Sequence, residues 1–528
     1  MTFELYCYLA VGAVICAFTG VLCSVSMTGI LQQSGYSGKG FLRWYCRYGN
    51  MMPGRNALLS LTLLLLVALV NLCFSFLGHA WANLISALPF LGLSVFYYFS
   101  SKHAVKVPLK CTNRVIRLSV CYFLFLFAVA YGMGIGFSFA AVSVGKELGY
   151  LLRYTPVCLL PNFYPFVLVA ANTVMLCYEL PHNRAYIRKA KKALAASDCI
   201  KVGITGSFAK TSVKNIARAV LSVRYNVIAT PASYNTPIGL GRAVKENGLD
   251  CDIFLAEMGA RREGDIRELC DMVNPDYGVV TGICPQHLQT FGTMHAIVKE
   301  KGVLASRVKK SCVVGESAYA AGIEGALVAG RDFAAEEVEI SPDGTKFTLR
   351  LGEEKIRVET ELLGRTAAED IALAAALCSL LGMSVKEIKA GISLAKPVPH
   401  RLQKIEDNGL FILDDSYNSN IEGAKDAVET LRLFGGKRYI VTPGLVELGH
   451  IEGKANEELG ASLVGLDAVI LVGETLVLSV RRGYLAAGGD AQKLRVVPTL
   501  GAAKKILAEE LGAGDCVLFL NDLPDLYN

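Results

Sequence analysis

The distribution of apolar residues along the chain constrains its fold more than any single motif does. Residues 1–182 hold five apolar stretches long enough to cross a lipid bilayer, which takes about 20 residues of helix. They lie near 5–31, 57–77, 80–101, 116–142 and 155–178. The pattern predicts an N-terminal α-helical transmembrane bundle of about five helices over residues 1–182. A four-span bundle with one interfacial helix is the alternative, because Pro156, Pro161 and Pro165 interrupt the last stretch.

Basic residues mark one side of this predicted bundle. Lys and Arg gather in the segments that follow the first, third and fifth stretches. Such residues concentrate on the cytoplasmic side of membrane proteins. We therefore expect a multi-pass protein with its N-terminus outside and a basic cytoplasmic linker at 183–198. Everything after residue 183 is expected in the cytoplasm, and membrane lipid is an expected partner.

Charge and cysteine usage exclude other classes of protein. Of the 53 Lys and Arg residues, 11 lie in residues 1–182, whereas only three of the 47 acids do. Residues 183–528 therefore carry 42 basic and 44 acidic groups, which argues against a nucleic-acid partner. The 16 cysteines form no CxxC pair, and we expect them to act as small apolar residues.

From about residue 199, short β-branched runs alternate with helical periods. The runs KVGIT, YNVIA, DIFLAEM and YGVVTGI are followed by amphipathic segments at 210–223, 237–248, 263–273 and 293–309. A second series contains GLFILDD, RYIVTPG, AVILVGE and DCVLFLND. Strands that alternate with helices predict parallel sheets with crossover helices. We expect two α/β domains, at 199–396 and 397–528, divided where Pro397 and Pro399 stand.

A candidate phosphate-binding loop connects the first strand to its helix. The strand KVGIT is followed by GSFAKTSVKNIARAV, a glycine-containing turn that leads into a helix. Backbone N–H groups at such a helix start cradle phosphates. Lys210 would reach the β- and γ-phosphates, and the Thr211 hydroxyl would hold Mg²⁺. An ordinary strand–helix turn is the alternative. The predicted nucleotide-binding residues here are Thr205, Gly206, Ser207, Ala209, Lys210, Thr211 and Ser212.

Further motifs follow in a fixed order. They are SYNTPIGL, LAEMGARREGDI, ICPQHLQTFGT, a lysine-containing helix at 298–304, DDSYNSN, and ELG at 447–449. Over residues 199–528 this series resembles the Mur ligase family, most closely the branch that joins D-alanyl-D-alanine to the UDP-N-acetylmuramoyl tripeptide. The resemblance implies a P-loop ATPase-like central domain and a Rossmann-like C-terminal domain. It also implies an enzyme that phosphorylates a carboxylate with ATP, so that an amine attacks the acyl phosphate.

The resemblance assigns roles to individual residues. Glu257, at the end of a strand, and His287 match metal-binding residues that would hold Mg²⁺ together with Thr211. Lys301 matches a carbamylated lysine that helps to hold a second Mg²⁺. The alternative is that Lys301 and the nearby Lys299 are both plain lysines on the surface of a helix. Asn235 matches a loop beside the γ-phosphate and the substrate carboxylate.

Three more residues are expected to contact ATP. Arg401 and Asp415 match residues that reach ATP from the C-terminal domain, where an Arg binds phosphate and an Asp binds ribose hydroxyls. Asp370 is expected to accept a hydrogen bond from the adenine amine. The implied catalytic set is Lys210, Asn235, Glu257, His287 and Lys301.

The sequence departs from the family pattern in several places. Ala209 stands where the family has Gly, which restricts the backbone beside the phosphate. Thr366, Ala367 and Asp370 replace the usual His and Asn residues of the adenine segment, and Ile421-Glu422-Gly423 follows DDSYNSN. No segment between 183 and 198 has room for the uridine-binding domain of soluble members, so we expect the apolar region to replace it.

The sequence thus predicts an ATP- and Mg²⁺-dependent amide ligase in the bacterial cytoplasmic membrane, with its catalytic domains in the cytoplasm. The expected partners are a cell-wall precursor peptide, either UDP-linked or lipid-linked, an amino-acid or dipeptide amine donor, and other cell-wall enzymes. A ligase for another membrane-associated polymer, such as poly-γ-glutamate, is one alternative. A nucleotide-binding scaffold without turnover is a second, and an ATP-driven transporter is a third.

Overall fold

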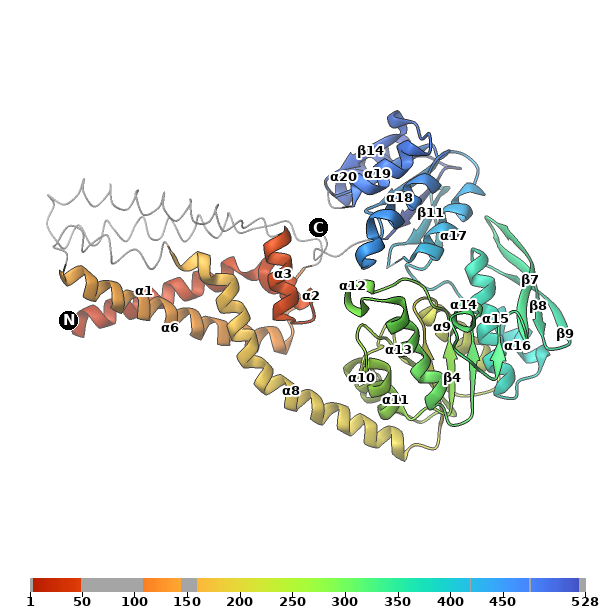
Figure 1. Cartoon of the computed structure of the whole chain (residues 1–528), viewed down its shortest axis with the longest axis horizontal. Coiled ribbons are helices and arrows are strands. Elements are labelled where there is room, and N and C mark those ends of the chain that lie inside the picture. Colours follow the sequence, from red (N-terminus) through yellow and green to blue (C-terminus); the bar gives the residue numbers. More distant parts are fainter. Residues whose placement is uncertain (1–2, 49–107, 144–158, 418, 474–475, 522–528) are drawn as a thin grey trace. The chain divides into compact units, whose positions relative to one another are not determined.

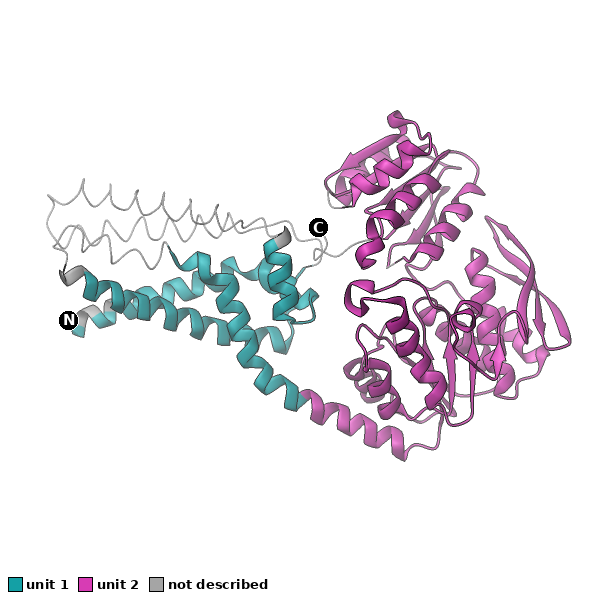
Figure 2. Ribbon diagram, in the orientation of Figure 1, with its two compact units in different colours: residues 1–182, 524–528 teal, residues 183–523 magenta. Residues whose placement is uncertain are grey.

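The computed structural model describes residues 3–48, 108–143, 159–417, 419–473 and 476–521 (Figure 1). The chain divides into two units, residues 1–182 with 524–528 and residues 183–523 (Figure 2). Helix α8 (Tyr164–Ala196) includes most of the segment predicted as a linker, which is therefore helical up to Ala196. The two units are described separately below.

The first unit is helical in every part that the structure describes. It contains α1 (Phe3–Cys23), α2 (Val25–Gln33), α3 (Gly38–Tyr48), α6 (Asn113–Ser143), the 3₁₀ turn η2 (Leu160–Phe163) and the first half of α8. Helices α1 and α6 pack together, and a Cβ on Gly20 would lie 2.7 Å from Leu126. The Ser24 hydroxyl lies 2.8 Å from the Tyr122 hydroxyl. Small residues thus allow close helix contact, and the buried hydroxyls of Ser24 and Tyr122 are paired.

The structure tests three of the five predicted spans. Within the described residues, two helical segments are long and apolar enough to cross a membrane, 113–140 and 160–196, or three if a bent pair counts as one span. The first predicted span is that bent pair, because the chain breaks at Ser24 into α1 and α2 with a 51° bend. The predicted spans at 57–77 and 80–101 lie outside the described residues.

The first domain of the second unit is built on a six-stranded parallel sheet with the order β2-β3-β1-β4-β5-β6. The strands are β1 (Ile200–Thr205), β2 (Val227–Ala229), β3 (Ile253–Glu257), β4 (Tyr277–Val280), β5 (Ser311–Val314) and β6 (Leu327–Val328). All of β3 is buried, as expected for a parallel strand covered on both faces. Strand β1 has β3 on one side and β4 on the other, so the crevice beyond its carboxyl end is where such sheets bind ligands.

Helices cover both faces of this sheet. Ile253 and Leu255 belong to a core with residues of α9 (Lys210–Leu221), α15 (Arg365–Leu380) and α16 (Val385–Ile392). The alternate residues Phe254 and Ala256 belong to a second core with residues of α10 (Pro237–Asn247), α11 (Asp265–Val273) and α13 (Met294–Arg307). Two short helices, α12 (Leu288–Phe291) and α14 (Glu316–Ala320), complete the domain.

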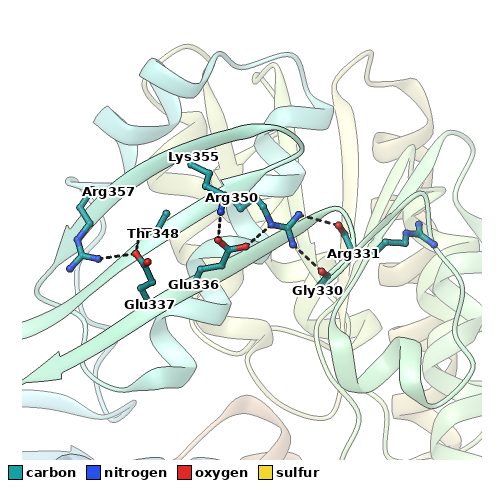
Figure 3. A network of polar contacts seen from close by, with 8 residues as sticks. All are labelled: Gly330, Arg331, Glu336, Glu337, Thr348, Arg350, Lys355 and Arg357. Carbon is teal, nitrogen blue, oxygen red and sulfur yellow. Dashed lines mark hydrogen bonds and ion pairs between the residues drawn. The ribbon is translucent and has the colours of Figure 1, made fainter.

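A three-stranded antiparallel sheet follows, made of β7 (Phe333–Ser341), β8 (Gly344–Leu351) and β9 (Glu354–Thr360). Its apolar face joins the core with α15. Its polar face carries the network in Figure 3, where Arg350 donates to Glu336 and to the Gly330 and Arg331 carbonyls. Lys355 donates to the second oxygen of the same carboxylate at 2.7 Å. The network holds the chain entering β7 against β8, although partly exposed ion pairs stabilise little by themselves.

The C-terminal domain has a second six-stranded sheet with the order β10-β11-β15-β12-β13-β14. Its strands are β10 (Gln403–Asp407), β11 (Leu410–Asp415), β12 (Arg438–Thr442), β13 (Ala468–Val472), β14 (Leu494–Val497) and β15 (Cys516–Leu520). Only β10 runs antiparallel to its neighbour. Its helices and 3₁₀ turns are α17 (Ile421–Arg432), η3 (Gly449–Ile451), α18 (Glu452–Ser462), α19 (Val477–Ala486), η4 (Ala491–Lys493) and α20 (Leu500–Glu510).

Ala209 has an unfavourable backbone conformation at the start of α9. Its φ of 65° and ψ of −9° lie in the left-handed region, which costs a non-glycine residue roughly 1–2 kcal/mol. Ala209→Gly removes that cost but makes the unfolded chain more flexible. We expect a net stabilisation of about 0.5–1 kcal/mol, seen by scanning calorimetry of the full chain as a rise in Tm of about 1–2 °C.

A matched control is available in the same helix. Ala219 lies in the right-handed interior of α9, where Ala→Gly destabilises by about 0.5–1 kcal/mol. The two identical substitutions are therefore expected to shift Tm in opposite directions. Equal losses in both variants would contradict the assigned strain at Ala209.

Candidate active site

The loop between β1 and α9 has the geometry of an anion site. Gly206 has a φ of 152°, and a Cβ there would lie 2.0 Å from the Thr281 hydroxyl. Ala209, the N-cap residue of α9, makes no side-chain cap, so the first N–H groups of the helix have no side-chain acceptor from it. Open N–H groups at a helix start favour phosphate. Of the predicted loop residues, Thr205, Gly206, Ser207 and Thr211 are buried.

The Lys210 ammonium lies across this loop. It donates to the Gly206 carbonyl at 2.8 Å and to the Ser207 carbonyl at 3.1 Å. Burial, opposed by the charge of Glu257, lowers the pKa of Lys210 to about 8. The charge of Arg401 also lowers this pKa, so the predicted arginine of the C-terminal region lies near the phosphate loop.

Glu257 connects three parts of the site. Its side chain, 1% exposed, stands at the carboxyl end of β3. One carboxylate oxygen accepts from the Thr211 hydroxyl and from the Lys214 ammonium, each at 3.0 Å. The other accepts from the Asn235 amide at 3.1 Å. The sequence prediction named Glu257, Thr211 and Asn235 but not Lys214. The sequence signal that could have revealed Lys214 is a lysine on the face of α9 that is otherwise buried.

Asn235 is fixed by its backbone as well as its side chain. Its carbonyl accepts from the Gly259 N–H at 2.8 Å. A Cβ on Gly259 would lie 2.7 Å from the Asn235 side chain. The glycine of the predicted motif LAEMGARREGDI is therefore needed for this close approach, which brings the 230–235 loop onto Glu257.

The two candidate lysines of α13 differ in how far they are buried. Lys301 is 2% exposed, whereas Lys299 is exposed. Burial and the nearby charge of Lys210 lower the pKa of Lys301 to about 7. Glu300, the residue between them, is used elsewhere, because it accepts from the backbone N–H groups of Gly264 and Ile266. Lys301 thus faces the phosphate loop as a largely desolvated amine.

His287 contacts the C-terminal domain. Its Nδ1 pairs with the carboxylate of Glu447, which also lies 3.7 Å from the Arg261 guanidinium. His287 and Glu447 both have positive φ, 56° and 65°. The sequence prediction noted the ELG motif that begins with Glu447 but gave this residue no role, because its partner lies 160 positions earlier.

The structure therefore brings part of the predicted metal set together. Among the residues that it describes, no three His, Cys, Asp or Glu side chains lie close enough to hold a metal ion. Thr211 and Glu257 nevertheless place two oxygen donors 3.0 Å apart beside the phosphate loop. Mg²⁺ commonly uses one or two such protein ligands, with phosphate and water oxygens completing its shell. These residues fit Mg²⁺ held jointly with a nucleotide.

The residues predicted to contact the nucleotide lie around Arg401. Its guanidinium stacks over the Tyr417 ring at 4.2 Å. Asp415, at the end of β11, accepts from the Leu402 N–H at 3.2 Å and from the Ser419 hydroxyl at 2.7 Å. Burial raises the pKa of Asp415 to about 6. Burial and the charge of Glu369 raise the pKa of Asp370, which is bonded to Ser212.

The predicted adenine segment is engaged by another residue. At the start of α15, Asp426 of α17 accepts from the Arg365 and Thr366 N–H groups at 2.9 and 2.8 Å. It also accepts from the Thr366 hydroxyl at 2.5 Å. A Cβ on Gly364 would lie 2.5 Å from this carboxylate. In this structure the segment is therefore a contact between the domains, which the sequence prediction missed.

Comparison with known proteins gives a consistent result for this region. The family model described as Mur ligase middle domain matches residues 204–378, and the one described as Mur ligase, glutamate ligase domain matches residues 400–521. The UDP-N-acetylmuramoyl-tripeptide–D-alanyl-D-alanine ligase of Escherichia coli (strain K12) is 31% identical over 291 residues, 52% of this chain and 64% of that ligase. The ligase of the same name from Bacillus subtilis (strain 168) is 30% identical over 272 residues, 49% of this chain and 59% of that ligase.

Solved structures share the fold. The crystal structure of MurF ligase from Thermotoga maritima in complex with ADP has a TM-score of 0.58 at 25% identity, covering 64% of this chain and 80% of that one. A MurF crystal structure from Acinetobacter baumannii gives 0.58 at 22% identity, covering 64% and 77%. The chain spans less than two thirds of the length of the E. coli and B. subtilis ligases.

These findings correct the predicted localisation. The matches to the family models begin at residue 204. The described residues contain two helical segments of spanning length and apolarity, or three with the bent pair, and two of the five predicted spans lie outside these residues. The multi-pass placement in the bacterial cytoplasmic membrane that the sequence predicted is therefore wrong, and the expected lipid partner loses its basis. Residues 204–378 and 400–521 contain every site residue described above, and through these two domains the chain belongs to the Mur ligase family.

Proposed function

We propose that this chain is an ATP-dependent, ADP-forming amide ligase. The observation that carries the proposal is the hydrogen bond between Glu257 and Thr211 at the phosphate loop, with Arg401 near Lys210. A carboxylate and a hydroxyl at that position suit a magnesium–nucleotide complex. Positive charges from both domains would then face the phosphates, where a phosphoryl group is transferred.

The residues of the chain have separate tasks in this reaction. The loop N–H groups and Lys210 would bind the β- and γ-phosphates, and Thr211 and Glu257 would hold Mg²⁺, whose charge would neutralise phosphate charge. Asn235 orients the substrate carboxylate toward the γ-phosphate. The carboxylate oxygen takes the phosphoryl group and ADP leaves. The amine then attacks the acyl carbon, an amide bond forms, and phosphate and a proton are released.

The substrate assignment follows the relatives. Those named above join D-alanyl-D-alanine to a UDP-N-acetylmuramoyl tripeptide, as their names state. We propose the same donor, with a cell-wall precursor peptide as the acceptor. A ligase for another polymer, such as poly-γ-glutamate, would use the same central site with a different acceptor. The scaffold alternative is less well supported, because a site without turnover has no need of the buried Glu257 network.

We propose further that Lys301 is carbamylated. Its neutral amine would attack CO₂, forming an N–C bond and releasing one proton. A pKa of about 7 leaves much of the amine neutral near neutral pH. The change replaces a cation beside Lys210 with an anion, which removes the repulsion between two buried cations. The resulting carboxylate would supply oxygen atoms to a second Mg²⁺, as His287 would supply a nitrogen.

Loss of Lys210 tests the reaction. We expect the purified chain to release ADP only when Mg²⁺, D-alanyl-D-alanine and an acceptor are all present, the acceptor being UDP-linked muramoyl tripeptide or its lipid-linked equivalent. Lys210→Ala should lower this rate at least about 100-fold, because charge stabilisation in the transition state is lost. The exposed Lys245→Ala is the control. If neither acceptor supports ADP release, a ligase for another polymer is favoured. If the protein binds ATP but never turns it over, the scaffold is favoured.

Lys301→Ala should lower kcat by about 100-fold or more, because one anionic ligand is lost. Lys299→Ala, which changes the same residue type two positions away on the exposed face, should retain the wild-type rate. A short carboxylate such as formate should partly restore Lys301→Ala, since it can enter the vacated space. ¹³C NMR of wild-type protein in ¹³C-bicarbonate should show a carbamate signal that Lys301→Ala lacks. Equal rates in the two variants would contradict the assignment.

Asp415 should make nucleotide affinity depend on pH. Because the pKa of Asp415 is about 6, its carboxylate gains a proton as the pH falls through 6 and becomes a weaker acceptor for ribose hydroxyls. We expect the KM for ATP to rise roughly tenfold between about pH 7.5 and pH 5. Asp415→Asn should show a raised KM with little further change over this range. Asp407→Asn changes an exposed carboxylate of the same domain and should behave as wild type. Protonation of ATP itself is the same for all three proteins, so it cannot produce a difference between them.

A further inference from the structure

Lys214 is a buried cation that the reaction described above does not use. It lies one helical turn after Lys210 on α9, and its side chain is 1% exposed. Lysine is almost never buried to this degree unless it is paired. The Lys214 ammonium donates to the Glu257 carboxylate at 3.0 Å and to the Ala232 carbonyl at 2.6 Å. Lys210 donates instead to two loop carbonyls, so the two lysines of this helix have different environments.

The position of Lys214 matters because of what Glu257 already holds. The oxygen that accepts from Lys214 also accepts from the Thr211 hydroxyl. The Glu257 carboxylate and the Thr211 hydroxyl are the two groups assigned above to Mg²⁺. The negative charge at that point is therefore balanced by an ammonium that belongs to the chain. A divalent cation binding there meets a carboxylate whose charge is already neutralised, next to a fixed positive charge.

Lys214 also fixes the loop that carries Asn235. Ala232, whose carbonyl accepts from Lys214, has a φ of 42° in the left-handed region. The loop is held before this point by the Thr230 hydroxyl, which accepts from the Glu257 N–H at 3.1 Å. It is held after this point by Gly259, whose N–H donates to the Asn235 carbonyl. The Lys214 ammonium is the contact between these two ends, and it stabilises an unfavourable conformation.

We propose that Lys214 is a positioning residue, a tethered cation that holds Glu257 and the 230–235 loop in place before a divalent cation enters, and that weakens the binding of this cation. The inference rests on the proposed function, because it takes Glu257 as a metal ligand. Pairing with Lys214 meets much of the cost of burying the carboxylate in the metal-free protein. The metal then binds weakly by itself and needs the phosphates of the nucleotide, which couples metal entry to nucleotide entry.

The test removes the charge of Lys214 and measures binding of Mg²⁺ alone. In the full chain, Lys214→Met keeps the apolar stem and Lys214→Gln keeps a hydrogen-bond donor. Without metal, we expect both variants to have a lower Tm than wild type. Mg²⁺ should raise the Tm of both more than it raises that of wild type, and calorimetric titration should show about tenfold tighter binding, or about 1.4 kcal/mol. Lys214→Gln should keep a higher kcat than Lys214→Met.

Two controls separate charge from packing. Arg218→Met removes a cation one turn further along α9, on the exposed side, and should change Mg²⁺ affinity less than twofold. Lys214→Met combined with Glu257→Gln removes both partners, so it should recover Tm without gaining Mg²⁺ affinity. If Lys214→Met does not fold without metal, refolding in Mg²⁺ should restore it. Unchanged or weaker Mg²⁺ binding in both single variants, or no recovery of Tm in the double variant, overturns the inference.

The proposed function and this inference fail in different ways. If Glu257→Gln leaves the Mg²⁺-dependent rise in Tm intact, then Glu257 is not a metal ligand and the proposed site is wrong. If that rise depends on Glu257 but not on the charge of residue 214, then Lys214 has only a structural role. The second result would leave the ligase proposal standing.

Discussion

The burial of the Glu257 carboxylate is the interaction on which the site depends. A carboxylate that is almost fully removed from water is tolerated only where donors surround it. Here they come from α9, which supplies Thr211 and Lys214, and from the 230–235 loop, which supplies Asn235. The parallel pairing of Ile204 with Glu257 places this group beside the end of β1, where the phosphate loop begins. Sheet register thus determines which side chains meet.

Four residues in or beside this region have unfavourable backbone conformations. Ala209, His287, His400 and Glu447 all have φ between 56° and 65°. Each such residue costs roughly 1–3 kcal/mol and persists only where its surroundings hold it. His287 and Glu447 hold one another across the two domains. His400 is bonded to Asp414 at 2.8 Å, next to Arg401. These conformations therefore lie where the domains meet and where the nucleotide is proposed to bind.

Much of the fold could be predicted from local patterns. The strand–helix alternation gave β1 to β4 and their helices within a few residues, because apolar period and turn residues are local signals. Strands β5 and β6, the antiparallel β7–β9 sheet, β10 and β14 were not predicted. Lys301 and Lys299 could not be separated by sequence, since only packing shows which one is buried. Lys214 was missed because its partner is 43 positions away. In the N-terminal region, hydropathy identifies an apolar stretch but does not show that its helix breaks at Ser24.

The contacts between the two domains explain why the C-terminal residues of the site were the hardest to predict. Asp426 belongs to α17 yet accepts from the N–H groups at the start of α15, a distance of about 60 positions in sequence. A helix start left without this acceptor would have unsatisfied N–H groups, so the carboxylate stabilises the association of the domains. It does so at the segment that the resemblance predicted to contact adenine. A nucleotide that reached this segment would have to share it with Asp426 or displace it. Both the N–H and the hydroxyl of Thr366, at the position of that departure, already have an acceptor within the chain.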